Sequence, residues 1–392
     1  MELKTLKAEN YDELLNLLNK TFSNKYGREM DFLSEQPKMW VRDDEHMEKH
    51  FGIFEDGRLV AVTGLYPFTV RIGDAALKFA TTGNVATHPD YEGRGYFSAT
   101  FGRVMEELPK MGIDVARLGG ARQRYARYGY EPAGTVYKIN FGKDNRIKYF
   151  RNGGADVEFF RIEKEDTDAL KYVNGLSRKS KIFVERSEEY GYRDVFAAIS
   201  TKHSVPYLAV RGGKPIGYIS AYSSKQYVGY SEWGTNISEI RAESCSDFVD
   251  MICAYQRRAE GSILFSLPPY MTEELNIFSK SAEAISVASP SHFKVMNYEK
   301  LADALMKIKE KDTMLKGEAI MEIDGYGALR FYSGDGECGC ERCDAKAALT
   351  LDRLSATRVL FGHLPPYEIK AKSPLLASWL PLPLSWDTLD FV

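Results

Sequence analysis

The sequence has little cysteine, little net charge and no long uninterrupted apolar run. Its 392 residues include five cysteines, too few, and odd in number, for a secreted disulfide scaffold. The formal net charge of −3 gives no global basic field for nucleic acid. The most apolar stretch, residues 374–384, contains three prolines and is too short to span a bilayer, and the first residues form no apolar signal region. We therefore expect a cytoplasmic protein that binds neither nucleic acid nor membrane.

The chain does have enough hydrophobic sequence for more than one core. Hydrophobic residues make up 44% of it and charged residues 27%, which is typical of well-folded globular proteins. A length of 392 residues predicts two or three domains. Strand-like runs pair across Asp56 and Gly57, a strong hairpin signal, and alternate with helical patterns. We expect a mixed α/β fold.

Residues 82–98 predict a phosphate-binding turn. An apolar strand leads into a loop with Gly93 and Gly95, and a helix through Phe101 follows. The glycines let the backbone approach a bulky ligand, because neither has a Cβ atom. The first N–H groups of the helix favour a pyrophosphate. The loop is neither a P-loop nor a dinucleotide-binding motif, since no Gly-Lys-Ser/Thr follows and the G-x-G-x-x-G spacing is absent.

This loop resembles the acetyl-CoA loop of the GCN5-related N-acetyltransferases (GNATs), whose motif is R/Q-x-x-G-x-G/A. Gly95 matches the central glycine of that motif. Glu92 stands where the family has Arg or Gln, and Phe97 stands where it has Gly or Ala. Thirty residues on, 118–134 are similar to the family segment "aY...GY.p.g", in which a helix tyrosine faces the thioester. With both segments at this spacing, residues 1–150 are identified as similar to a GNAT domain.

Two further units follow. Residues 151–290 echo the order of the first unit, but no glycine loop precedes their long helix, so a degenerate GNAT-like domain without cofactor is expected. Residues 141–155 are polar with a glycine pair and are interpreted as a linker. Residues 291–392, beginning with the strand-like 293–296, are similar to sterol carrier protein domains. This layout is that of the Eis family (enhanced intracellular survival acetyltransferases), which the chain resembles over nearly its whole length.

The resemblance implies an α/β (α+β) fold with tandem GNAT domains and a C-terminal sterol carrier protein-like domain. It also implies that acetyl-CoA binds the first unit and that no metal is needed. A strand end would hold the pantetheine arm, the glycine loop would hold the pyrophosphate, and Arg94 would add a charge-assisted contact. Phe97 is also expected to pack into the core. The cofactor residues implied are Val85, Ala86, Thr87, Gly93, Arg94, Gly95, Tyr96, Phe97, Ser98, Gly120 and Ala121.

Acetyl transfer to an amine needs a proton for the departing thiolate. By resemblance, Tyr125 is the donor, and a phenol with a pKa of about 10 stays protonated at neutral pH. Tyr128 lies one helical turn further on and shares roughly the same face, so it competes for the role. Tyr130 is a third candidate, but it is expected to pack inside.

The family also uses its own terminal carboxylate as a catalytic group, and here that carboxylate belongs to Val392. No basic residue occurs from Ser373 to the end, and Asp387 and Asp390 add negative charge. Such a tail favours polyamine-like acceptors. The tail also contains Trp379, Trp386 and Phe391, which are expected to be buried.

Cys338, Cys340 and Cys343 form a cluster that the acetyltransferase interpretation does not need. They are predicted to lie in a hairpin turn. Three thiolates can bind zinc with a fourth ligand such as His363, but no second pair of cysteines supports a site. A structurally idle turn is the favoured interpretation.

Two functions remain at this stage. The first is an acetyl-CoA-dependent N-acetyltransferase acting on a primary amine of a cationic small molecule, aminoglycoside- or polyamine-like, or on a lysine side chain. Members of the family form hexamers, so the resemblance implies a homo-oligomer. The alternative is a catalytically inactive GNAT-fold protein that binds an apolar ligand through its sterol carrier-like domain. Glu92 and Phe97 favour the alternative, whereas Tyr125 and the acidic tail favour the enzyme.

Overall fold

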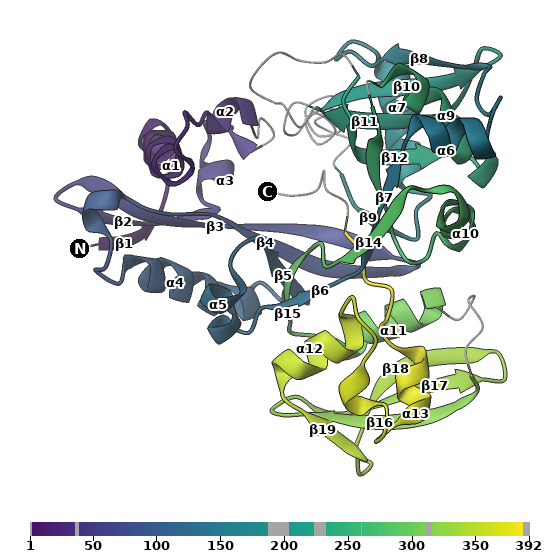
Figure 1. The fold of residues 1–392 in the computed structure, drawn as a ribbon. Helices are drawn as coiled ribbons and strands as arrows, with labels where there is room; N and C mark the ends of the chain where they lie inside the picture. Colours follow the sequence, from purple (N-terminus) through teal and green to yellow (C-terminus); the bar gives the residue numbers. More distant parts are fainter. Residues whose placement is uncertain are drawn as a thin grey trace.

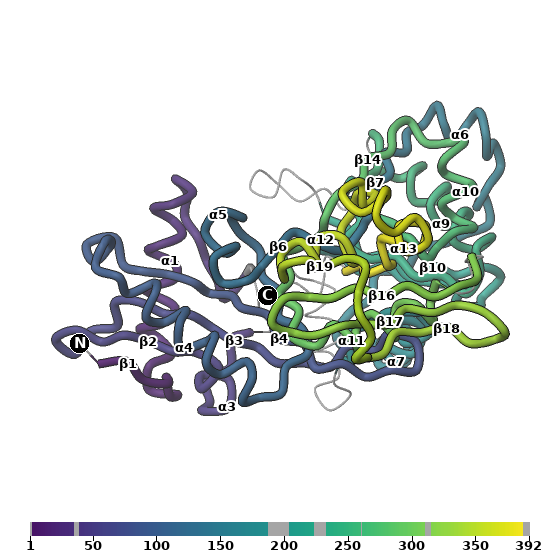
Figure 2. Tube along the Cα trace, turned by 90° about the horizontal axis from the view of Figure 1, so that it is seen from below, coloured from purple at the N-terminus to yellow at the C-terminus, as the bar shows by residue number. Residues whose placement is uncertain are grey.

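The computed structural model describes residues 2–35, 39–186, 204–222, 233–259, 261–309 and 315–386. These residues form sheets of eight, seven and four strands. Figure 1 shows the first sheet at the left, the second at the upper right and the third at the lower right. In the view from below, the third unit covers the junction of the other two (Figure 2). The predicted α/β class is confirmed.

The first sheet has the order β1-β2-β3-β4-β5-β15-β6, and β9 pairs with β3. Its hairpin between β2 and β3 turns at Asp56 and Gly57, whose φ angles of 50° and 77° suit a two-residue turn. The predicted hairpin is confirmed. The strands are β1 (Glu2–Thr5), β2 (His50–Glu55), β3 (Arg58–Ile72), β4 (Ala75–Thr87), β5 (Val115–Leu118), β6 (Glu131–Ala133), β9 (Ile182–Val184) and β15 (Ser291–Val295).

Helices cover the first sheet because each has one apolar stripe. Helix α1 buries Leu14, Leu17 and Leu18, and α4 buries Phe101 and Val104. Helix α1 contacts β3 and β4, and α4 contacts β2, β3 and β4. The helical segments here are η1 (Ala8–Asn10), α1 (Tyr11–Tyr26), α2 (Phe32–Glu35), α3 (Asp44–Met47), η3 (Pro89–Tyr91), α4 (Tyr96–Lys110), α5 (Arg122–Tyr125) and η4 (Ala126–Tyr128).

The second sheet has the order β14-β7-β13-β12-β11-β10-β8. Its core is an apolar cluster that includes Phe248 and Ile252 of α9 and Phe278 of α10. The strands are β7 (Val136–Phe141), β8 (Val157–Arg161), β10 (Val205–Arg211), β11 (Lys214–Tyr222), β12 (Asn236–Ala242), β13 (Ile263–Leu267) and β14 (Ala284–Ala288). The helices are α6 (Lys143–Tyr149), α7 (Thr167–Ser177), α9 (Cys245–Arg258) and α10 (Thr272–Ser281).

The first two sheets exchange strands across the expected boundaries near residues 150 and 290. Strand β7 lies before residue 150 but pairs with β13 and β14 of the second sheet. Strand β15 lies after 290 but returns to the first sheet, between β5 and β6. The expectation that 293–296 opens the third unit is therefore wrong. The expected linker at 141–155 is also wrong, because α6 occupies seven of its residues and packs against α9.

The third sheet has the order β18-β17-β16-β19, and helix α11 packs on β18. One apolar cluster joins this unit to the end of β3, to the start of β4 and to the segment that ends at Trp386. The elements are α11 (Tyr298–Lys309), β16 (Gly317–Ile323), β17 (Gly327–Gly334), β18 (Glu337–Cys343), β19 (Leu349–Leu351), α12 (Arg353–Phe361), η7 (Tyr367–Ile369) and α13 (Pro374–Trp379). None of the helices within the described residues is long and apolar enough to cross a membrane.

Candidate active site

A cleft of about 580 Å³ opens on the first unit, between α1, the end of β4, the glycine loop and the α5–η4 segment. Eight of the eleven residues expected at the cofactor lie on its wall. The described residues that line it are Thr21, Phe22, Asn24, Lys25, Val85, Ala86, Thr87, Pro89, Tyr91, Glu92, Gly93, Gly95, Tyr96, Phe97, Ser98, Arg124 and Arg127.

The cleft exists because β4 extends beyond the last residue that pairs with β5. The two parallel strands pair from Phe79 to Thr81, opposite Val115 to Arg117. Beyond Thr81, β4 continues to Thr87 with only β3 paired to it among the described residues. Backbone groups on the open edge can therefore hydrogen-bond a ligand laid along the strand.

A buried polar chain fixes a bulge in this part of β4. Asn84 has a φ of 50°, and the pairing register with β3 shifts beside it. Its side-chain amide donates to the Tyr66 hydroxyl at 2.5 Å, and that hydroxyl is 2.7 Å from Nε2 of His50. Nδ1 of His50 lies 3.2 Å from the Met47 carbonyl, which assigns the proton to Nδ1. Burial lowers the pKa of His50 to about 4, so the ring is neutral and accepts from Tyr66.

The glycine loop meets the start of α4 as the sequence predicts. Gly93 and Gly95 have φ angles of 78° and 82°, which glycine adopts without strain. Gly95 is the N-cap of α4, and no side chain caps the helix. The N–H groups of the first turn point towards the helix start, so they are available to an anion.

Arg94 belongs to this loop but does not line the cleft. Its Nη1 lies 3.3 Å from a carboxylate oxygen of Glu55, and its guanidinium lies 4.7 Å from the Tyr91 ring centroid. The Tyr96 hydroxyl also donates to Glu55. Glu92, at the position of the family's Arg or Gln, lies exposed on the cleft wall.

Tyr125 lies behind Phe97, with only 6% of its surface exposed. Its ring packs 6.2 Å from that of Phe97 and 5.4 Å from that of Phe101. Burial raises the pKa of Tyr125, while the neighbouring Arg124 lowers it. Tyr125 also lies against Gly120, where an added Cβ would come within 2.5 Å of the ring. Neither Gly120 nor its exposed neighbour Ala121 lines the cleft.

The other two tyrosines differ in burial. Tyr128 is half-buried, with its ring 4.5 Å from that of Phe101. Tyr130 is fully buried, as expected, and its hydroxyl lies 3.1 Å from Oγ1 of Thr82. Phe97 itself is half-buried, so its ring is shared between the core and the cleft.

Three cations on the cleft wall had not been expected. They are Lys25 from α1, Arg124 from α5 and Arg127 from η4. The two arginines lie three residues apart in a short helical segment, so they share one face. That spacing in the printed sequence, directly around Tyr125, was the signal that could have identified them.

In the described part of the second unit, the long helix begins differently from α4. Its long helix α9 begins after Ser244, whose hydroxyl accepts from the Asp247 N–H at 3.1 Å. Asp247 and Asp250 also bind Arg211. A capped helix start with two carboxylates beside it is unfavourable for a pyrophosphate.

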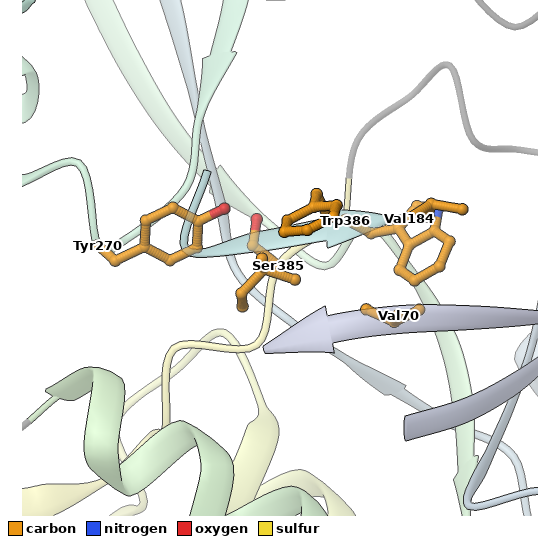
Figure 3. A pocket seen from close by; sticks show the side chains of 7 residues that line it. Val70, Val184, Tyr270, Ser385 and Trp386 are labelled. Atoms are coloured by element: carbon orange, nitrogen blue, oxygen red, sulfur yellow. The ribbon is translucent and has the colours of Figure 1, made fainter. Parts of the chain in front are cut away.

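The segment before the terminus passes between the first and second units. Trp379 and Trp386 are buried, as expected. Figure 3 shows Trp386 close to Val184 and Val70, and Ser385 close to Tyr270. Asp387, Asp390, Phe391 and Val392 lie outside the described residues.

The cysteine cluster lies on a strand, so the prediction of a turn is wrong. Cys338 and Cys340 of β18 are buried, whereas Cys343 is half-buried. Within the described ranges, no group of three or more His, Cys, Asp or Glu side chains is arranged to hold a metal ion.

Comparison with known proteins agrees with this geometry. Residues 2–133 match the family described as acetyltransferase (GNAT) domain. A GCN5-related N-acetyltransferase from Kribbella flavida is 18% identical with a TM-score of 0.67, and the match covers 100% of both chains. A probable N-acyltransferase from Enterococcus faecalis V583 is 15% identical with a TM-score of 0.68, covering 98% of this chain and 99% of that one. Eis1 from Mycobacterium abscessus is 11% identical with a TM-score of 0.65, covering 99% of both chains.

No curated protein matches the chain in sequence. The family match and the structural likeness together confirm the predicted GNAT acetyltransferase domain and its fold. The first third of the chain is thus an acetyltransferase domain of the GNAT family.

Proposed function

We propose that this GNAT domain makes the chain an acetyl-CoA-dependent N-acetyltransferase of the Eis type. The observation that carries the proposal is the cleft where β4 runs on past β5 and meets the glycine loop. The open strand edge suits the amide-bearing pantetheine arm, and the uncapped start of α4 suits the pyrophosphate. The backbone of Val85, Ala86 and Thr87 and the loop from Gly93 to Ser98 are the proposed contacts.

The chemistry proposed is attack of a neutral amine on the thioester carbonyl, followed by loss of the thiolate and release of one amine proton to water. Tyr125 is the proposed proton donor to that thiolate. Its raised pKa suits an acid that stays protonated at neutral pH. The bulge at Asn84, held by Tyr66 and His50, sets the direction of the strand edge along which the thioester would lie.

The Eis-type assignment rests on the organisation of the whole chain. The fold matches Eis1 of Mycobacterium abscessus over 99% of both chains. The units proposed are a GNAT domain, a degenerate GNAT-like domain and a sterol carrier protein-like domain, with β7 and β15 exchanged between the first two. The acceptor proposed is a primary amine of an aminoglycoside- or polyamine-like cation or of a lysine side chain, attracted by the acidic tail and oriented by the Val392 carboxylate.

The test is a thiol-release assay with acetyl-CoA and a panel of amines, run beside calorimetry of acetyl-CoA binding. The expected result is one bound cofactor per chain and turnover with polycationic amines. Size-exclusion chromatography with light scattering tests the proposed homo-oligomer, possibly a hexamer. Absence of acetyl-CoA binding would contradict the enzyme and leave the apolar-ligand alternative.

A further inference from the structure

The glycine loop lacks a cation directed into the cleft. Glu92 puts a negative charge on the wall, and Arg94 is engaged by Glu55 and Tyr91 outside the lining. An acyl-CoA carries a diphosphate and a 3′-phosphate, so a protein without a matching cation would bind it by backbone N–H groups alone. The compensating charge must come from another element or be absent.

Arg124 and Arg127 supply cations to the same cleft from the α5–η4 segment. Their guanidinium carbons lie 5.6 and 5.7 Å from the centroid of the Phe97 ring, and Arg127 also lies 4.9 Å from the Tyr128 ring. Both side chains are exposed, and no carboxylate of the described chain forms an ion pair with either of them. Phe97 is on the first turn of α4, so the ring places both guanidinium groups beside the helix start.

We propose that Arg124 and Arg127, held over the Phe97 ring, bind the phosphate groups of the acyl-CoA in place of a loop arginine. This inference rests on the proposed function. It accounts for both departures from the family motif. The α5–η4 segment provides the cations that Glu92 does not provide, and the Phe97 ring orients them. Guanidinium groups suit the role because they bind phosphate oxygens with two parallel hydrogen bonds and lie flat on aromatic rings.

The test uses R124Q, R127Q and the double variant of the full chain, with R103Q as a matched control. Arg103 lies on α4 and pairs with Glu107 at 2.8 Å, away from the cleft lining. The ligands are acetyl-CoA, acetyl-3′-dephospho-CoA and S-acetylpantetheine, which has no phosphate. Calorimetry gives the Kd of the nucleotides, and the assay gives kcat/KM for all three.

Each glutamine variant should raise the Kd of acetyl-CoA about tenfold, since a charge-assisted hydrogen bond is lost. In R127Q, kcat/KM with S-acetylpantetheine should stay unchanged, and the salt dependence of acetyl-CoA binding should become shallower. F97L should weaken acetyl-CoA binding in the same direction, because both guanidinium groups lose their ring. If the arginine variants lose less affinity for acetyl-3′-dephospho-CoA than for acetyl-CoA, the arginines contact the 3′-phosphate. If they lose the same affinity for both ligands, the arginines contact the diphosphate.

Three results would overturn the inference. Wild-type affinity in R124Q/R127Q would do so, as would an equal loss with S-acetylpantetheine in R127Q, which would indicate a structural role. A tenfold loss of acetyl-CoA affinity in R94Q, without such a loss in R124Q/R127Q, would show that Arg94 of the glycine loop binds the phosphates. Failure of the wild-type chain to bind acetyl-CoA at all would overturn the proposed function itself, and so differs from all three.

Discussion

The guanidinium carbon of Arg117 lies 4.9 Å from the centroid of the Trp386 ring. Arg117 is fully buried on β5, and its Nη1 donates to Oγ1 of Thr81 at 3.1 Å. Thr81 and Arg117 are the last residues at which β4 and β5 pair, so Trp386 is stacked where the cleft begins to open. Phe79 stacks on the same indole with ring centroids 5.7 Å apart. Trp386, the last described residue, therefore packs into the core of the GNAT domain.

Replacing Trp386 by alanine should destabilise the protein by about 3–5 kcal/mol, since a large buried ring is lost from a core that joins two units. Trp386→Phe should cost less, because it keeps an aromatic ring beside Phe79 and Arg117. Urea unfolding followed by circular dichroism measures both. Tyr367→Ala is the control, since that ring is 74% exposed and its loss should change little.

A change at the extreme terminus should affect turnover without unfolding the chain. Six residues follow Trp386, and an extended chain of that length spans roughly 20 Å. The proposed role of the Val392 carboxylate depends on its position, so a C-terminal tag or deletion of Phe391 and Val392 should lower kcat. Val392→Phe, which keeps the carboxylate in place, should be tolerated. Full activity in a folded, C-terminally extended protein would rule out a catalytic carboxylate.

Tyr125→Phe should lower turnover about 10²- to 10⁴-fold, the usual contribution of a positioned acid. The hydroxyl alone is removed, so the packing against Phe101 and Gly120 and the affinity for acetyl-CoA should remain. Because burial raises the pKa of Tyr125, the wild-type rate should show no loss from tyrosine ionisation as pH rises to 9. Normal turnover in Tyr125→Phe together with a defect in Tyr128→Phe would move the role one helical turn along the chain.

Gly95→Glu should abolish acetyl-CoA binding. The backbone φ of 82° strains any side chain there, and a carboxylate at the start of α4 repels phosphate. Gly102→Glu puts the same charge on α4, at a site where an added Cβ meets nothing within 4 Å, and should bind acetyl-CoA normally.

Calorimetry should also give one cofactor per wild-type chain, because Ser244 caps the corresponding helix of the second unit. Two sites per chain would contradict the assignment of the second unit as degenerate.

The free energy of unfolding should fall as the pH decreases from 6.5 to 4, because of His50. Its pKa is about 4 in the fold against 6.5 for an exposed histidine, so unfolding takes up a proton below pH 6.5. The loss should begin near pH 6.5, reach about 3 kcal/mol and level off below pH 4. His50→Gln should be less stable at pH 7 but lose less between pH 6.5 and 4. His88 and His292 also have pKa values lowered by burial, so the difference between the two proteins is the quantity to measure.

Local sequence determined the turns, the glycine loop and the short helix that carries Tyr125. Asp56 and Gly57 make a two-residue hairpin, and Gly93 and Gly95 adopt positive φ, because these conformations depend on the residues themselves. The burial of Trp379 and Trp386 also followed from residue type.

Tertiary structure alone decided which strands share a sheet and where the charges of the site point. Strands β7 and β15 read as members of the units next to them in sequence, but pairing partners far along the chain place each in the other sheet. Glu55 engages Arg94, whereas Phe97 lies beneath Arg124 and Arg127, and nothing in the local sequence distinguishes these arginines. The reason is physical: a strand or a long cationic side chain has nearly the same local energy in several positions, so contacts distant in sequence select one.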